Sequence, residues 1–71
     1  MNRTPVSSSN LSSVGYDEDT QVLEVEFNNG GIYQYFGVPA AVYEGLMNAV
    51  SHGQYFDRHV KKAGYRYEKV N

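Results

Sequence analysis

A hairpin signal in residues 27–36, with the sequence FNNGGIYQYF, constrains the fold of this chain more than any other stretch. Asn and Gly tolerate the positive φ angles that tight turns between strands require, and apolar residues alternate with others on both sides. The strand before the turn, with the sequence VLEVEF, alternates apolar and acidic side chains. This alternation predicts a strand with one apolar and one polar face.

Two turn lengths fit this hairpin. A two-residue turn of Asn29 and Gly30 pairs Phe27 with Ile32 and leaves the two tyrosines of the second strand opposite the glutamates. A three-residue turn that starts at Asn28, with a bulge at Gly30, shifts the pairing by one residue and turns the tyrosines inward. We favour the two-residue turn because it collects five apolar side chains on one face. These are Leu23, Val25, Phe27, Ile32 and Phe36.

Two helices are predicted after the hairpin. Pro39 opens the first, because proline suits the first helical position, and apolar residues then recur at helical spacing. This stripe consists of Val42, Tyr43, Leu46, Met47 and Val50. The second helix is predicted over residues 54–62, with Asp57 and Lys61 paired one turn apart. Gly64 is expected to be its left-handed cap. The inward positions are Tyr55, Phe56, His59, Val60 and Ala63.

The remaining segments complete an α+β fold. Residues 1–10 are polar and are expected to form a flexible tail, and residues 11–70 to form a single domain. A first strand is predicted at residues 14–16, before the hairpin. Residues 65–70 look extended and can return to the edge of the sheet. The predicted architecture is a three-stranded antiparallel meander with two helices packed on one face, with this C-terminal edge strand as an optional addition.

Composition excludes several classes of protein. The chain has 71 residues and no cysteine, so neither a disulfide framework nor a thiolate zinc site is available. We therefore expect a reducing cytoplasm. Residues 1–9 hold one apolar side chain, Val6, after the first methionine, so we expect neither a signal segment nor a membrane span.

Residues that could do catalysis do not form a recognisable set. His52 and His59 lack a companion carboxylate cluster, so no metal site is expected. Ser51, His52 and Asp57 are the residue types of a hydrolytic triad, but one short run cannot place them in a relay. The glycines match no phosphate-binding spacing. We expect no enzymatic activity and no cofactor.

Several motifs along the chain together resemble the KTSC domain, which occurs at the C-terminus of some lysyl-tRNA synthetases and as a free-standing small bacterial protein. The hallmark of that family is a central Tyr-x-Tyr, here Tyr33-Gln34-Tyr35. The other motifs are Ser12-Ser13, Val14-Gly15-Tyr16-Asp17, Leu23-x-Val25-x-Phe27, Gly31-Ile32, Val38-Pro39, Ala49-x-Ser51-x-Gly53 and Tyr55-Phe56. The resemblance covers residues 12–70. It implies a domain for which RNA binding has been suggested and to which no catalytic residues carry over.

The net charge of −2 hides an asymmetry between the two parts of the chain. Residues 1–50 carry six carboxylates and one arginine, whereas residues 51–71 carry five cations and two carboxylates. Basic residues with interleaved tyrosines are typical of a groove that follows a nucleic-acid strand. The candidate nucleic-acid-binding residues are Arg58, Lys61, Lys62, Tyr65, Arg66, Tyr67 and Lys69. The alternative interpretation is a solvated helix face followed by a charged edge strand.

Tyr33 and Tyr35 of the central motif are a second candidate surface for RNA. They could stack unpaired bases, or they could be strand-forming residues that cover the sheet. In the favoured register two glutamates lie beside them and would repel phosphates, so the basic stretch is the better RNA surface. We hypothesise a small non-catalytic domain that binds single-stranded RNA or tRNA. The alternative is a module for protein-protein interaction that uses a sheet edge or an apolar patch.

Overall fold

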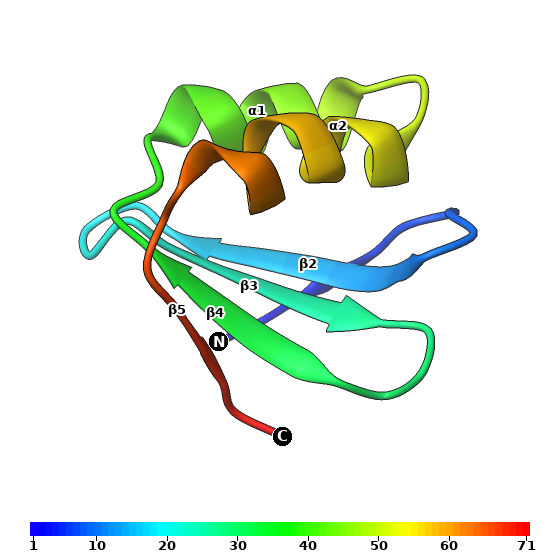
Figure 1. The fold of residues 1–71 in the computed structure, drawn as a ribbon, viewed down its shortest axis with the longest axis horizontal. Helices are drawn as coiled ribbons and strands as arrows, with labels where there is room; N and C mark the ends of the chain where they lie inside the picture. Colours follow the sequence, from blue (N-terminus) through cyan, green and yellow to red (C-terminus); the bar gives the residue numbers. More distant parts are fainter.

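The computed structural model describes residues 1–71 and contains one antiparallel sheet covered on one face by helices (Figure 1). The five strands lie in chain order across the sheet. They are β1 (Thr4–Pro5), β2 (Leu11–Asp17), β3 (Val22–Phe27), β4 (Ile32–Phe36) and β5 (Tyr67–Lys69). The helices are α1 (Ala40–Asn48), α2 (His52–His59) and a short 3₁₀ helix, η1 (Lys61–Ala63). No helix has both the length and the apolar character needed to cross a bilayer.

The α+β class and the two helices on one face are confirmed, but the sheet has five strands rather than three. The optional C-terminal strand forms as β5, which pairs with β4. β1 lies inside the segment that was expected to be a tail, and it pairs with β2 through Thr4 and Val14. Two features hold this N-terminal segment against the sheet. The Arg3 side chain contacts Glu24 of β3, and the Leu11 side chain is buried in the core.

The hairpin between β3 and β4 uses the three-residue turn, so the register that we favoured is wrong. The Phe27 amide donates to the Gly31 carbonyl (2.8 Å), and the Gly30 amide donates to the Phe27 carbonyl (2.9 Å). Gly30 has a φ of 93°, which is the left-handed position of a turn followed by a bulge. Both tyrosines consequently lie on the apolar face, where Tyr33 is opposite Val25 and Tyr35 is opposite Leu23.

The side-chain contacts available on each face of the sheet explain this register. The outer face provides partners for the glutamates, since Gln34 lies opposite Glu24 and donates to its carboxylate (2.8 Å). The inner face offers apolar neighbours to two large rings. The two-residue turn would instead have placed the polar Gln34 side chain opposite Val25 on the apolar face, away from Glu24.

The core lies between β2, β3 and β4 and the two helices. Its nine buried residues are Leu11, Val14, Leu23, Val25, Tyr35, Val38, Leu46, Phe56 and Val60. α1 contributes only Leu46 to this set. Val50, predicted in the apolar stripe of α1, is fully exposed because the helix ends at Asn48 and the chain turns extended at Ala49.

α2 differs in its bounds from the prediction. It begins at His52, where Ser51 caps it by accepting from the Gln54 amide (3.2 Å). It ends at His59, which is exposed rather than inward, and the chain then tightens into η1. Gly64 is left-handed, as predicted, but it caps η1 and not α2. Asp57 pairs with Lys62 (3.2 Å) instead of Lys61.

Candidate functional site

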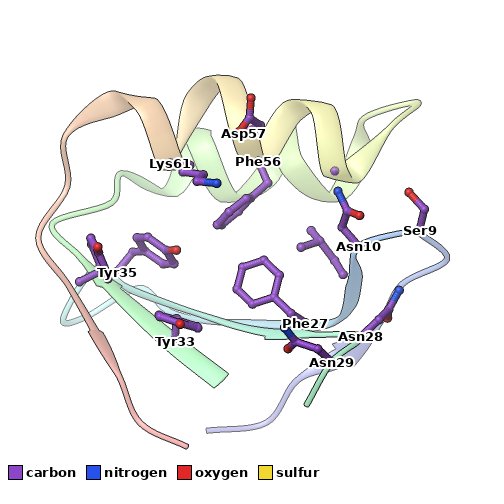
Figure 2. A pocket seen from close by; sticks show the side chains of 13 residues that line it. Ser9, Asn10, Phe27, Asn28, Asn29, Tyr33, Tyr35, Phe56, Asp57 and Lys61 are labelled. Atoms are coloured by element: carbon purple, nitrogen blue, oxygen red, sulfur yellow. The ribbon is translucent and has the colours of Figure 1, made fainter. Parts of the chain in front are cut away.

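A groove of about 760 Å³ lies between α2 and the inner face of the sheet, toward β4 and β5 (Figure 2). Five aromatic side chains line it, and we call them the aromatic cluster. They are Phe27, Tyr33, Tyr35, Phe56 and Tyr67. Polar side chains, among them Asn10, Asn28 and Asn29, line the other end. The groove exists because α1 and α2 cover β2 and β3 more fully than they cover the β5 edge.

Each ring of the aromatic cluster contacts two others, so the contacts form a closed loop. Phe27 contacts Tyr33 at a centroid distance of 5.6 Å and Phe56 at 5.4 Å. Tyr35 contacts Phe56 at 5.3 Å and Tyr67 at 5.5 Å, and Tyr67 contacts Tyr33 at 6.2 Å. The three contacts of Phe27 and Phe56 are edge-on, an arrangement that aromatic quadrupoles favour, and the two contacts of Tyr67 are tilted. The strand pairing of β3, β4 and β5 brings four of these rings together, and α2 supplies the fifth.

Tyr35 has an unusual environment within this cluster. Its side chain is 6% exposed, and its hydroxyl makes no hydrogen bond to the protein but points into the groove (Figure 2). Burial, together with the neighbouring phenols of Tyr67 and Tyr33, raises the pKa of Tyr35 to about 12. The hydroxyl is therefore protonated at neutral pH and is a hydrogen-bond donor that faces open space.

The predicted basic residues do not share one surface. Lys61 lines the groove, and Lys69 lies opposite Tyr33 in the sheet and so shares its face. Lys62 is engaged by Asp57. Arg58 borders a smaller hollow between the interhelical loop and α2.

The remaining predicted residues lie elsewhere. The Arg66 guanidinium is 4.7 Å from the ring centroid of Phe36, which alternates with Tyr35 and lies on the outer face of the sheet. Tyr65 packs against the core. Of these seven predicted residues, Lys61 and Tyr67 line the groove. The two tyrosines of the central motif line it as well.

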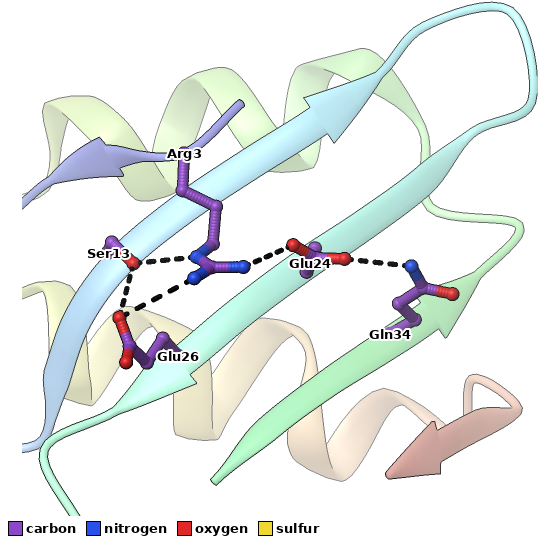
Figure 3. Close-up of polar contacts among 5 residues, drawn as sticks. All are labelled: Arg3, Ser13, Glu24, Glu26 and Gln34. Carbon is purple, nitrogen blue, oxygen red and sulfur yellow. Dashed lines mark hydrogen bonds and ion pairs between the residues drawn. The ribbon is translucent and has the colours of Figure 1, made fainter. Parts of the chain in front are cut away.

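The outer face of the sheet carries a charged network that is separate from the groove (Figure 3). Arg3 contacts Glu24 and Glu26, and it donates to the Ser13 hydroxyl (2.9 Å). Burial by itself would raise the pKa of Glu24, but hydrogen bonds from Gln34 and Arg3 and the positive charge of Arg3 hold that pKa below its ordinary value. The two glutamates are thus on the face opposite the tyrosines.

Phe27 and Phe56 belong to the groove, and our sequence analysis placed them only in the core. The available signal was the three-residue turn, because that register puts Phe27 and both tyrosines on one face. The histidines have structural contacts. The Nδ1 atom of His52 is 2.8 Å from the Leu46 carbonyl oxygen, and the His59 ring lies 4.3 Å from that of Tyr55. No three histidine, aspartate or glutamate side chains converge as metal ligands would.

Comparison with known proteins gives a consistent set of similarities. A family model described as the KTSC domain matches residues 7–67. An uncharacterized protein of Stutzerimonas stutzeri is 42% identical over the full length of both chains. A lysine-tRNA ligase of Nostoc sp. is 43% identical over 61 residues, which are 86% of this chain and 11% of the ligase. The crystal structure of a KTSC domain protein from Yersinia pestis superposes with a TM-score of 0.91 and 44% identity, covering 99% of this chain and 97% of that one.

Proposed function

Because this chain belongs to the KTSC domain family, we propose that it is a non-catalytic binding domain that holds single-stranded RNA in the groove between the sheet and α2. The similarity to a region of lysine-tRNA ligases supports an RNA with unpaired bases, such as tRNA, as the partner. That region is about a tenth of each ligase, so the similarity extends to a domain and not to the aminoacylation chemistry.

The aromatic cluster is the observation that carries this proposal. Proteins that bind single strands combine exposed aromatic rings with nearby cations, and each stacked base contributes about 1–3 kcal/mol. Here Tyr67 is 59% exposed, Tyr33 is half-buried, and Lys61 lies on the same groove. Lys69, opposite Tyr33, adds a second cation on this side of the sheet.

The distribution of acidic groups supports the same partner. Glu24 and Glu26 lie on the outer face, where both form ion pairs with Arg3. Asp57, which lines the groove, is paired with Lys62. A phosphate backbone that follows the groove would therefore meet Lys61 without an unpaired carboxylate among the lining residues.

The test compares two charge reversals on opposite faces of the sheet. We expect Lys61→Glu to weaken binding of a labelled single-stranded RNA of about 12 nucleotides, a length within known site sizes. The affinity of this variant for RNA should also depend less steeply on salt concentration, because each lost phosphate contact removes about one released counterion. Arg66→Glu makes the same change in net charge on the outer face and serves as the matched control. Fluorescence anisotropy at two salt concentrations measures both.

Two results would contradict RNA binding in the groove. The first is that the wild-type protein binds no RNA even at low salt and high protein concentration. The second is that Lys61→Glu and Arg66→Glu weaken binding equally, because this would indicate a response to net charge alone.

A protein partner is the second candidate function, and the free edge of β5 favours it. All three residues of β5 are exposed, and the strand ends the sheet. The Val70 amide donates to Ile32 (2.8 Å), so by alternation the Lys69 amide points away from β4 and could pair with an added strand. Lys69→Pro removes that amide, whereas Lys69→Ala keeps it. Loss of a captured partner with proline alone would support strand addition.

A further inference from the structure

We infer, resting on the proposed function, that one unpaired base of the bound RNA enters the aromatic cluster and accepts a hydrogen bond from the Tyr35 hydroxyl. The ligand class is a nucleobase that presents an acceptor, a ring nitrogen or a carbonyl oxygen, on its exposed edge. Tyr35 is then a specificity-determining contact within the groove, distinct from the stacking surfaces of Tyr33 and Tyr67.

The unpartnered hydroxyl is the first step of the argument. No fully buried side-chain polar atom of this protein lacks a hydrogen-bond partner. The Tyr16 hydroxyl, for example, donates to the Val38 carbonyl. The Tyr35 hydroxyl makes no hydrogen bond to the protein, so although most of the residue is buried, this oxygen is open to the groove (Figure 2). A group held in this way is available to a ligand.

The surrounding rings are the second step. Phe27 and Phe56 approach the same space as the Tyr35 hydroxyl from the sheet and from α2, respectively (Figure 2). Both rings are held by their neighbours in the cluster, so the site is formed before any ligand arrives. A flat aromatic ligand would contact these π surfaces while its edge meets the hydroxyl, as in proteins that recognise unpaired bases.

The local charge is the third step, and it distinguishes a base from an organic cation. Several aromatic rings around one space also suit a quaternary ammonium group. In this groove, however, Lys61 adds a positive charge, and the carboxylate of Asp57 is already paired with Lys62. These charges disfavour a cation and favour a ligand that carries phosphate beside its aromatic part.

Titration with three small probes, followed by NMR of the aromatic side chains, tests the inference. We expect adenosine 5′-monophosphate to shift the signals of Tyr35, Phe27 and Phe56 in a saturable way. Ribose 5-phosphate, which lacks the base, should leave these three signals unchanged. If tetramethylammonium saturates the cluster and the nucleotide does not, the inference is overturned in favour of a cation site.

A pair of tyrosine variants isolates the hydroxyl. Tyr35→Phe removes one oxygen that makes no hydrogen bond to the protein, so we expect the variant to fold and to bind nucleotide roughly five- to tenfold more weakly. Tyr43→Phe is the matched control, because it removes a tyrosine hydroxyl from a ring that stacks on Tyr16 outside the groove, and it should bind as the wild-type protein does.

The same variants separate this inference from the proposed function. If the wild-type protein binds RNA and Tyr35→Phe binds it equally well, the hydrogen bond is disproved and RNA binding stands. If the wild-type protein binds the mononucleotide at the cluster but no RNA, the base site stands and the proposed function fails. If neither ligand binds, both fail.

Discussion

Gly30 shows how one residue can determine which side chains line the groove. Its φ of 93° closes the three-residue turn, and that turn sets the pairing of every residue in β4. A β-branched residue resists this conformation even where space is free, and no atom lies within 4 Å of a β-carbon built at Gly30. The requirement at this position is therefore one of backbone conformation and not of packing.

We predict that Gly30→Val lowers the free energy of unfolding by about 1–3 kcal/mol, the usual range for a residue forced into a sparsely populated conformation. Gly31→Val should cost less. Gly31 has no positive φ, and its β-carbon would meet only side-chain atoms, the nearest being the Asn29 Oδ1 atom at 3.2 Å. Denaturant unfolding of both variants checks the order. Equal, small losses would show that the turn does not depend on Gly30.

At the scale of elements, β1 depends on the network on the outer face of the sheet. The strand has two residues, and the Arg3 side chain beside it is held by Glu24, Glu26 and Ser13. Close contact also matters here, since a β-carbon at Gly15 would lie 2.6 Å from the Asn2 carbonyl oxygen. Glycine at this position lets the N-terminal segment cross the sheet.

We predict that Arg3→Ala destabilises the protein by about 1–3 kcal/mol at neutral pH, because it removes charged hydrogen bonds from a buried carboxylate. The folded-state pKa of Glu24 lies below the ordinary value of 4.5, so its ionised form stabilises the fold above that pH. This contribution is lost as the pH falls through the lower, folded-state value. The stability difference between wild type and Arg3→Ala should therefore shrink on acidification.

Thermal unfolding at several pH values measures this difference. Glu24→Gln is the control, because it keeps the size of the side chain and removes the titrating group. A stability difference between wild type and Arg3→Ala that stays constant from neutral to acidic pH would contradict the role given to Glu24.

Sequence patterns predicted the elements that have their own periodicity and missed those that depend on a distant partner. Alternation identified β3 and β4, helical spacing of apolar residues identified α1, and glycine chemistry identified the left-handed Gly64. β1 has no such pattern, since its position depends on Arg3 and on residues of β3. The predicted nucleic-acid-binding residues are divided between the two faces of the sheet, because the positions of their side chains depend on how β5 pairs with β4. Alternation along the C-terminal segment puts Tyr67 and Lys69 on the groove side and Arg66 on the other.

At the scale of the whole molecule, one thin core holds sheet and helices together. Leu46 is completely buried and is the one fully buried residue of α1. Phe27 is partly exposed because it also forms a wall of the groove. The same layer of side chains therefore provides both stability and a binding surface, and substitutions should separate the two according to burial.

We predict that Leu46→Ala costs about 2–5 kcal/mol, since it leaves a cavity under α1. Phe27→Ala should cost less than Leu46→Ala, because part of its ring already contacts solvent. Val50→Ala, at a fully exposed position, is the control and should change stability by less than about 0.5 kcal/mol. Chemical denaturation of the three variants tests this order. A Leu46→Ala loss as small as the control would place α1 outside the cooperative core.

The pairing of Phe27 with Gly31 has a consequence for how this hairpin tolerates changes in length. Removal of Asn28 leaves Asn29 and Gly30 as a two-residue connection between the same paired residues, and Asn-Gly is the preferred sequence for such a turn. Removal of Gly31 instead brings Ile32 opposite Phe27 and exchanges the two faces of β4. Two single-residue deletions in one loop would thus have opposite effects, because removal of Asn28 would preserve the groove and removal of Gly31 would move both tyrosines to the outer face.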